Sequence, residues 1–304
     1  MKRLVYLVGS VASVAALSWF GLPYLVNTEQ ESVSVTQGDV GRGAYLARAS
    51  GCIACHTTAN SAQALTGGAG LETPFGVFFA PNLTTDTTHG IGSWTLNDFA
   101  TALRKGISPS GEPYYPAFPY SFYKSFSDQD IADLWAAFQT VPPAAVPDKP
   151  NELGFPFNIR QGIFAWQALF FDGLSERDPD QPTRPLDEKF SRGEYLVESA
   201  THCAACHTPR NLFGALDQSK AYAGTDQPLE GSGTIPAITP TALKQAGWSE
   251  KDLSYALQSG IKPDGDVFGG SMGEVVKEGT AYLQKSDLDA IAYYIFQREE
   301  NPKK

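Results

Sequence analysis

All four cysteines of this 304-residue chain lie in two copies of one short pattern, Cys-x-x-Cys-His. In a helix, residues three positions apart share a face, so both thiols of a copy can bond to one edge of a porphyrin. The histidine that follows can turn one ring nitrogen toward the iron and donate a hydrogen bond from the other. The pattern therefore predicts two covalently attached haem c groups. The predicted attachment and iron-binding residues are Cys52, Cys55 and His56 in the first copy, and Cys203, Cys206 and His207 in the second.

Other uses of paired cysteines fit this pattern less well. A zinc site of four cysteines places its two pairs about 15–20 residues apart, whereas Cys55 and Cys203 are separated by 148 positions. A thioredoxin-like redox pair belongs in a strand–helix–strand unit and has no use for the following histidine. A chance match would not occur twice and account for every cysteine in the chain.

The composition is that of a globular chain with about two domains. Its 29 glycines and 21 prolines indicate long structured loops, as expected where a chain wraps a flat cofactor. The formal net charge of −10 argues against a nucleic-acid partner, because such partners select for a basic surface. An acidic surface can steer a basic redox partner, although its ordinary role is to keep the protein soluble.

An apolar run extends from Leu4 to Val26 without a charge, directly after Lys2 and Arg3. Its 23 residues are enough to span a bilayer, and the two cations place its start on the cytoplasmic side, so the remainder is exported. A cleaved signal peptide, with an apolar core of about 7–15 residues, is the alternative. The run continues beyond such a core, so we expect an uncleaved anchor within residues 1–30; the alternative is a soluble periplasmic protein.

The rest of the chain is a duplication. Arg42-Gly-x-Tyr45-Leu precedes the first motif, and Arg192-Gly-x-Tyr195-Leu precedes the second, 150 positions later. A spacing this long indicates duplicated domains, because the units of a solenoid are about 20–50 residues. We expect a mostly α-helical fold after the anchor. Its predicted parts are a first haem domain at 37–141, a structured linker at 142–187 and a second haem domain at 188–300.

Each domain is expected to contain the same helices. A short helix is predicted at 96–105 and its counterpart at 249–259. Ser127 and Ser286 precede acidic residues and apolar runs at a spacing of 159, a pattern typical of helix N-caps. The linker is strongly aromatic at 164–171, so we expect it to pack across both domains and not to act as a floppy tether. The alternative is that it covers a face directed at a membrane or a partner.

The second axial ligand of a haem c is most often a methionine. The chain has two, and Met1 belongs to the cytoplasmic tip, so Met272 is the candidate. It lies 65 residues after His207 in the sequence Gly-Gly-Ser-Met-Gly, where the glycines allow the chain to approach a haem face closely. We expect Met272 to bind the second iron.

The first haem lacks the corresponding ligand. The position equivalent to Met272 is Phe118, and phenylalanine cannot bind iron. The first iron is therefore five-coordinate, or it uses His89, Lys124 or a neighbouring tyrosine. His89 is chemically the best substitute, although an exposed loop histidine is its more ordinary role. His202 directly precedes Cys203 and is badly placed to bind the same iron, so we expect it to form a hydrogen bond near the haem edge.

With these residues in view, the chain resembles the dihaem cytochrome c family, which is related to the cytochrome c subunits of periplasmic alcohol, aldehyde and gluconate dehydrogenases. The resemblance covers nearly everything after the anchor and rests on the segments Arg42–Leu46, Tyr115–Tyr120, Phe155–Arg160 and His202–Asn211. It implies two tandem cytochrome c domains, and it supports Met272 as the ligand of the second haem.

The family pattern does not carry over completely. Many dehydrogenase subunits carry three haems, whereas this chain stops at two. Relatives place methionine at the position of Phe118 or of Phe126, and this chain has methionine at neither. The resemblance also implies that Trp94, Trp248 and Arg104 lie near haem propionates.

These observations predict a membrane-anchored electron carrier on the periplasmic side of the bacterial inner membrane. It takes single electrons from a periplasmic dehydrogenase and passes them to a cytochrome or terminal oxidase in the respiratory chain. An enzyme that binds peroxide at an open first haem is the alternative. We expect no catalytic residues in the carrier and no nucleic-acid partner.

Overall fold

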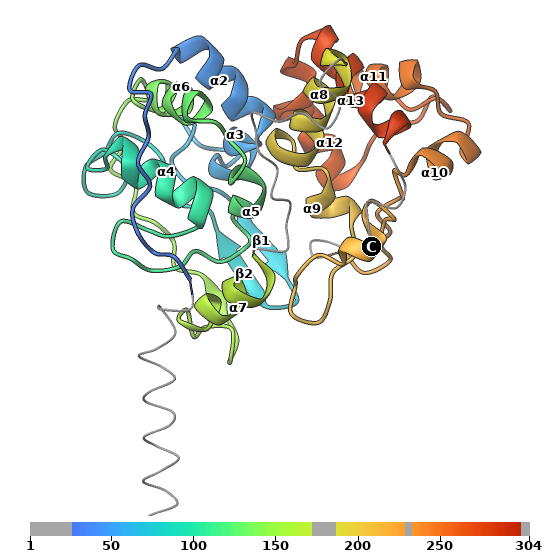
Figure 1. Ribbon diagram of the computed structural model, residues 1–304. Helices are drawn as coiled ribbons and strands as arrows, with labels where there is room; N and C mark the ends of the chain where they lie inside the picture. Colours follow the sequence, from blue (N-terminus) through green and yellow to red (C-terminus); the bar gives the residue numbers. More distant parts are fainter. Residues whose placement is uncertain (1–25, 172–186, 229–232, 299–304) are drawn as a thin grey trace, which may run out of the picture.

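The computed structural model describes residues 26–171, 187–228 and 233–298 and is mostly helical, as expected (Figure 1). The first half contains α2 (Val40–Ala49), α3 (Cys52–His56), α4 (Leu96–Lys105), α5 (Tyr120–Tyr123) and α6 (Asp128–Phe138). The second half contains α8 (Glu188–Tyr195), η2 (Leu196–Ala200), α9 (Ala204–His207), η3 (Gln218–Lys220), α10 (Pro240–Gln245), α11 (Glu250–Ser259), α12 (Gly270–Glu278), η4 (Thr280–Tyr282) and α13 (Lys285–Gln297). The helices expected at 96–105 and 249–259 are both present, as α4 and α11.

In each half the first helix packs against the last, and a glycine makes this close crossing possible. A Cβ on Gly43 would lie 1.8 Å from the carbonyl oxygen of Asp133, and one on Gly193 would lie 2.1 Å from that of Ala290. No other residue fits at either crossing, because a Cβ would overlap backbone atoms that cannot move aside. The crossing of α2 with α6 is therefore repeated by α8 with α13.

These crossings correct one prediction about the helix starts. Ser127 caps α6 as expected, and its hydroxyl accepts a hydrogen bond from the backbone N–H of Asp130 at 3.1 Å. The N-cap of α13, however, is Gln284, so the expected cap at Ser286 is wrong. The two caps are 157 positions apart, as are Asp133 and Ala290 at the crossings. Helix packing therefore sets this register, and the similar acidic sequences do not.

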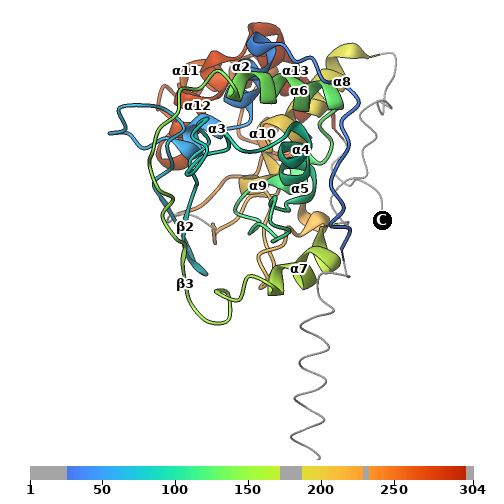
Figure 2. The same cartoon turned by 90° about the vertical axis from the view of Figure 1, so that its left-hand side faces the viewer.

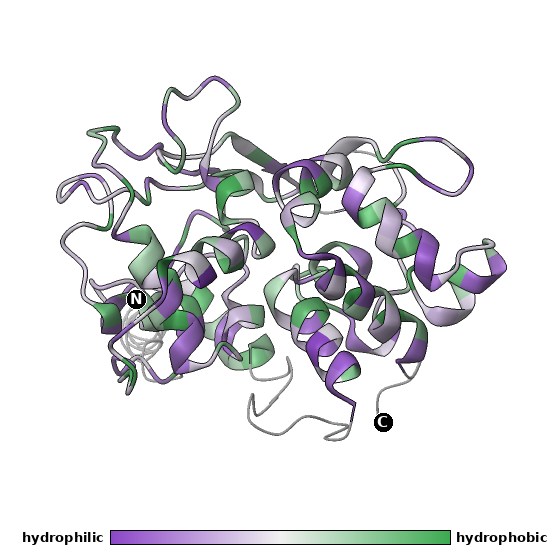
Figure 3. Cartoon of the chain, turned by 90° about the horizontal axis from the view of Figure 1, so that it is seen from above, coloured by the Kyte–Doolittle hydropathy of each residue, from purple (hydrophilic) through white to green (hydrophobic). Residues whose placement is uncertain are grey.

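The two halves lie side by side and contact each other directly (Figure 3). The Tyr45 hydroxyl donates a hydrogen bond to Asp287 Oδ2 at 2.6 Å. The side chain of Arg192 holds the same carboxylate, with Nη2 at 2.7 Å from Oδ2. A further pair of hydroxyls, Ser125 and Ser199, is buried in the interface at 2.5 Å. Buried residues of both halves form one continuous hydrophobic core.

A small antiparallel sheet extends from the first half. Strands β1 (Gly70–Thr73) and β2 (Gly76–Phe79) form a hairpin, and β3 (Glu152–Leu153) adds to β2. Because β3 follows the last helix of the first half, it ties the start of the predicted linker to that half.

The helix α7 (Gly162–Phe170) continues this segment and contacts both halves. Its Gln167 Nε2 donates to the carbonyl of Lys105 in the first half at 3.1 Å. Its Trp166 Nε1 donates to the carbonyl of Phe213 in the second half at 2.8 Å. The linker thus packs across both halves as far as residue 171, and residues 172–186 lie outside the described ranges. The domain boundaries themselves stay predictions.

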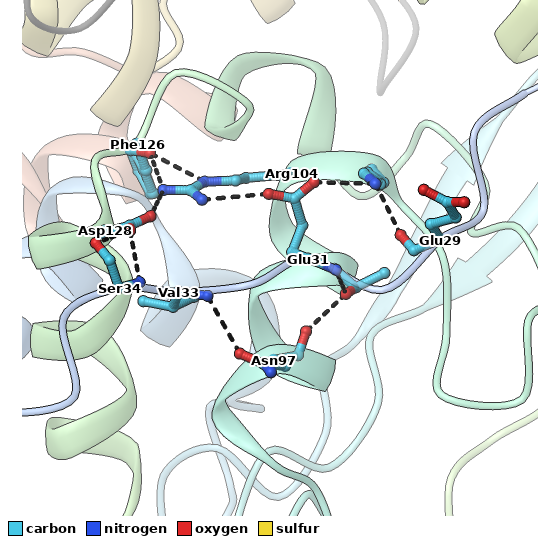
Figure 4. A network of polar contacts seen from close by, with 10 residues as sticks. Glu29, Glu31, Val33, Ser34, Asn97, Arg104, Phe126 and Asp128 are labelled. Carbon is cyan, nitrogen blue, oxygen red and sulfur yellow. Dashed lines mark hydrogen bonds and ion pairs between the residues drawn. The ribbon is translucent and has the colours of Figure 1, made fainter.

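Before α2, the chain runs in extended form along α4 and α6, held by the polar network of Figure 4. Arg104 is its centre: Nη2 donates to the Phe126 carbonyl at 2.7 Å and to Asp128 Oδ1 at 2.9 Å. Glu31 pairs with Arg104 Nη1 at 3.3 Å and with Lys105 Nζ at 3.0 Å. Arg104, which the family resemblance places near a propionate, is thus engaged by these two carboxylates.

The expected membrane anchor falls almost wholly on residues 1–25, outside the described ranges. Within residues 26–171, 187–228 and 233–298, no helix has both the length and the apolar character needed to cross a membrane.

Candidate haem-attachment sites

Both Cys-x-x-Cys-His motifs lie on short helices. The first forms α3, and the second forms α9 with Cys203 as its N-cap. The residue before each motif has a left-handed backbone, with φ of 70° at Gly51 and 38° at His202. This conformation ends the preceding helix and starts the motif helix in a new direction. It is unfavourable for histidine, because the Cβ of an L residue crowds the backbone there.

The first thiol of each motif lacks the depressed pKa that is typical of redox and zinc cysteines. Burial raises the pKa of Cys52 to about 12 and that of Cys203 to about 11. Redox-active and metal-binding cysteines instead have depressed pKa values. In the described ranges there is also no group of three or more His, Cys, Asp or Glu side chains that could hold a metal ion. Covalent attachment through both sulfurs fits these residues better.

The two histidines are oriented in the same way. Nδ1 of His56 donates to the Pro81 carbonyl at 2.7 Å, and Nδ1 of His207 donates to the Pro236 carbonyl at 2.9 Å. A carbonyl can only accept, so Nδ1 carries the proton and Nε2 keeps a free lone pair. Burial lowers the pKa of both rings, to about 4 for His56, so both are neutral. An iron ligand needs this state, and these residues fit haem c.

A duplicated loop places the proline carbonyls. After the first motif, the Leu65 N–H donates to the Thr57 hydroxyl at 3.1 Å; after the second, the Tyr222 N–H donates to the Thr208 hydroxyl at 3.0 Å. Leu65 and Tyr222 both adopt left-handed backbone, with φ of 67° and 62°. Each turn reverses the chain toward its histidine.

One further hydrogen bond holds the end of each loop in place. Two residues after the proline, the N–H of Leu83 donates to the carbonyl of the left-handed Leu65 at 2.8 Å. In the second half, the N–H of Ile238 donates to the carbonyl of Tyr222 at 2.9 Å. Sequence reasoning missed Pro81 and Pro236. The signal was available, because Pro-x-Leu/Ile-Thr occurs at 81–84 and again at 236–239.

Met272 lies near the start of α12, which follows Gly269 and packs against α11 and α3. Its side chain is half-buried and packs against the hydrophobic core. Its role as an iron ligand stays a prediction.

Around the first motif, aromatic side chains occupy the region where a methionine ligand would come from. The Phe118 ring lies 6.0 Å from the ring of Tyr123, and Phe126 stacks on Tyr123 at 5.0 Å. The Tyr123 hydroxyl donates to the Ser50 carbonyl at 2.7 Å. Burial, with the nearby Cys52 and Cys55 thiols, raises the pKa of Tyr123 well above its ordinary value. Tyr123 is therefore a protonated phenol.

The other candidate ligands of the first haem lie in separate elements. His89 belongs to the loop before α4, where its backbone N–H donates to Asp86 Oδ1 at 2.7 Å. The ammonium of Lys124 lies 5.4 Å from the ring centre of Phe171 in the linker. Neither finding assigns a ligand, and the alternatives stay open.

His202, which precedes the second motif, lies beside residues of the first half. Its ring lies 5.8 Å from the rings of both Phe122 and Tyr123, which belong to the first half. Its Cε1 is 3.8 Å from the position that a Cβ on Gly51 would occupy. The residues that precede the two motifs therefore lie close to each other across the interface of the two halves.

Comparison with known proteins shows the family of the chain. The chain is 41% identical over 289 residues to the diheme cytochrome c-type protein of Cereibacter sphaeroides, covering 94% of this chain and 93% of the relative. This chain belongs to the dihaem cytochrome c family. It carries two covalently bound haem c groups. No family model matches the chain.

Other relatives are subunits of dehydrogenases. The chain is 37% identical over 270 residues to the fructose dehydrogenase cytochrome subunit of Gluconobacter japonicus, covering 88% of this chain. It is 39% identical over 261 residues to the cytochrome c subunit of the quinone alcohol dehydrogenase of Gluconobacter oxydans, covering 84% of this chain. The matches cover 54% and 53% of those subunits, so the chain spans about half of their length.

Proposed function

We propose that this dihaem cytochrome c takes single electrons from a periplasmic dehydrogenase and passes them to a downstream cytochrome or terminal oxidase. The names of its relatives support the donor class, since several are cytochrome subunits of sugar and alcohol dehydrogenases. The observation that carries the proposal is the closeness of His202 to Gly51, because it places the two attachment motifs near each other around one core.

The cysteines and histidines of the two motifs would have different roles. Cys52 and Cys55, and likewise Cys203 and Cys206, tether the cofactors, so their positions do not depend on binding equilibria. His56 and His207 supply one axial nitrogen each. When bound, each haem supplies an iron that alternates between the ferrous and ferric states.

The axial ligands are proposed to differ between the sites. Met272 would complete the second site, and methionine ligation raises a haem's reduction potential. The first site has Phe118 and Phe126 where relatives have methionine, so we assign it the lower potential and the role of accepting electrons from the donor. Potentiometric titration of the purified protein should show two separated one-electron steps. Two indistinguishable high potentials would contradict this assignment.

We further propose that residues 1–30 anchor the protein in the inner membrane with its folded part in the periplasm. The uncharged run Leu4–Val26 after Lys2 and Arg3 supports this location. Membrane association that survives removal of residues 1–25 would count against the run as the sole anchor.

The electron-carrier role can be tested with membranes from cells that lack this chain. The purified holoprotein is added together with an alcohol, a sugar or an aldehyde, and its haem absorption is followed. Reduction that requires one of these substrates supports the proposal. No reduction with any dehydrogenase substrate, while dithionite still reduces both haems, would refute it.

A peroxidase-like enzyme is the second candidate, favoured only by the phenylalanines at positions 118 and 126. Carbon monoxide binding to the reduced protein separates the two functions. An unchanged spectrum means that both irons are fully ligated, which excludes catalysis at an open iron.

A further inference from the structure

One end of the molecule carries exposed apolar side chains from two distant segments. We name as the apolar patch the exposed Phe155, Leu169, Leu212 and Phe213 together with the half-buried Trp166 and Phe170. The exposed fraction is 93% for Leu212, 82% for Phe155, 74% for Leu169 and 67% for Phe213. Isolated exposed apolar residues are ordinary, but a contiguous group marks an interaction site.

Three rings of the apolar patch are in contact. The Trp166 ring lies 5.7 Å from that of Phe170, which stacks on Phe213 at 5.9 Å. The Trp166 indole N–H is already used by the Phe213 carbonyl, so the indole face is left for apolar contact. On the other face of α7, Phe164 and Gln167 are buried, which fixes the outward direction of Leu169.

The segment that carries Phe155 joins the same surface through its neighbour Phe157 and the hairpin. The ring of Phe157 packs on that of Phe75 at 4.7 Å. The Phe75 ring lies 3.1 Å from the position of a Cβ on Gly214, the residue after Phe213. The linker, the β1–β2 turn and the loop at 211–214 therefore form one surface.

The described chain begins at this same end. Figures 1 and 2 both show the first described residues beside α7. The carbonyl of Glu29 accepts from Lys105 Nζ at 2.7 Å, and the carbonyl of Lys105 accepts from Gln167 of α7 at 3.1 Å. Glu29 is thus linked to α7 through Lys105. It also lies only three positions after the end of the apolar run Leu4–Val26.

The charges near the apolar patch suit a lipid surface. The chain has a net charge of −10, so most of its surface is repelled by anionic lipids. The segment 153–171, however, contains no acidic residue, and its one charge is the cation Arg160, which lies 3.6 Å from Glu112. Aromatic side chains with few charges are favoured at the interface between headgroups and acyl chains.

We propose that the apolar patch inserts into the interfacial layer of the bilayer beside the N-terminal span. The patch then fixes the orientation of the folded part on the membrane, so that it does not rotate freely on the anchor. This inference rests on the proposed membrane location.

Spin labelling tests it on the full chain, haem-loaded and reconstituted in nanodiscs of phosphatidylethanolamine and phosphatidylglycerol. The native cysteines are consumed by thioether bonds, so an introduced cysteine is the single reactive thiol. The variants are Leu212→Cys in the apolar patch, Ala16→Cys in the apolar run and Tyr255→Cys as the control. Tyr255 is 53% exposed on α11, which lies at the opposite end of the molecule in Figures 1 and 2. Haem content of each variant confirms folding.

We expect the label at 212 to be relaxed by lipid-soluble oxygen more than by a water-soluble nickel chelate, with the reverse ratio at 255. Equal behaviour at 212 and 255, with the label at 16 in lipid, overturns the proposal and leaves the anchor standing. A label at 16 outside the lipid refutes the anchor instead, while lipid exposure at 212 then still supports the apolar patch. Protection at 212 that appears only with an added dehydrogenase identifies a protein-binding surface and also overturns the proposal.

Discussion

His202 and Gly51 face each other across the interface of the two halves, with the His202 ring Cε1 3.8 Å from the position of a Cβ on Gly51. Each residue directly precedes the first cysteine of a haem motif. Each also adopts a left-handed backbone. For His202 this costs about 1–2 kcal/mol relative to a relaxed conformation, which the packing of its ring on Phe122 and Tyr123 offsets.

The first prediction concerns the space at Gly51. A Cβ there would already touch the His202 ring and a Leu side chain adds three more carbons, so we expect Gly51→Leu to lower the free energy of unfolding by about 1–3 kcal/mol through overpacking. Gly111→Leu is the matched control, because Gly111 also has positive φ, 80°, and nothing lies within 4 Å of its Cβ position. Urea unfolding measures both. An equal loss in the two variants would show that only backbone strain matters and that the motifs do not touch.

The second prediction concerns Asp287, which receives hydrogen bonds from Tyr45 in one half and Arg192 in the other. Asp287→Ala leaves both donors without this acceptor and should cost about 2 kcal/mol, the range for hydrogen bonds to charged groups. Asp266→Ala serves as the control, because its pair with Lys262 is a surface contact with the carboxylate 68% exposed. Thermal unfolding in parallel should give a clearly larger loss for Asp287. A loss no larger than that of the control contradicts the interface.

Much of the fold could be predicted from the sequence, because the decisive signals were local. The two motifs, the helix at 96–105 and the Ser127 cap depend on residues within a few positions of one another. The cap of α13 was mispredicted: it lies two residues before Ser286, and its distance from the crossing with Gly193 matches that of Ser127 from the crossing with Gly43, a relation between segments about 100 residues apart. Pro81 and Pro236 were missed because they act through backbone carbonyls, which every residue has.

The interface between the two halves could not be predicted from the sequence, for a similar reason. Tyr45 and Asp287 are 242 positions apart, and nothing in the repeat indicates which face of one copy meets the other. The duplication predicts equal domains but not their docking. The same holds for the apolar patch, whose linker and loop segments come together only in the folded chain.

The third prediction is that stability depends on pH through the contact of Asp287 with Tyr45 and Arg192. Burial would raise the pKa of Asp287, but hydrogen bonds from Arg192 and Tyr45 outweigh it and hold the pKa below its ordinary value. The stabilisation is therefore present above about pH 4 and is lost as the pH falls below that value. Burial and the bond to Asp287 raise the pKa of Tyr45 to about 12, so its contribution is lost as the pH rises from 10 toward 12.

Urea unfolding at pH 7, pH 3 and pH 11 measures the loss of stability on the acid side and on the alkaline side. Tyr45→Phe should remove part of the loss at pH 11 and reduce the loss at pH 3 without abolishing it, because Arg192 still bonds to Asp287. If Tyr45→Phe has the same alkaline profile as the wild type, the hydroxyl does not titrate in this contact.

The fourth prediction separates the two haems through Met272. Met272→Leu removes a thioether while keeping a similar volume, so packing should change little. One reduction potential should fall by on the order of 0.1 V, within the span of about 0.8 V that axial ligands control. The other potential should stay constant. Val276→Ala, a buried change one turn further along α12, controls for general loosening of this helix. Two unchanged potentials would remove Met272 from the ligand set.

The most direct test of the whole account is the mass of the mature protein and of two variants after denaturation. The wild type should retain two haems per chain, because thioether bonds survive unfolding. Cys52→Ala with Cys55→Ala should retain one, and Cys203→Ala with Cys206→Ala should retain one. A wild-type chain without covalent haem, or either variant with two, would contradict the assignment of the attachment sites.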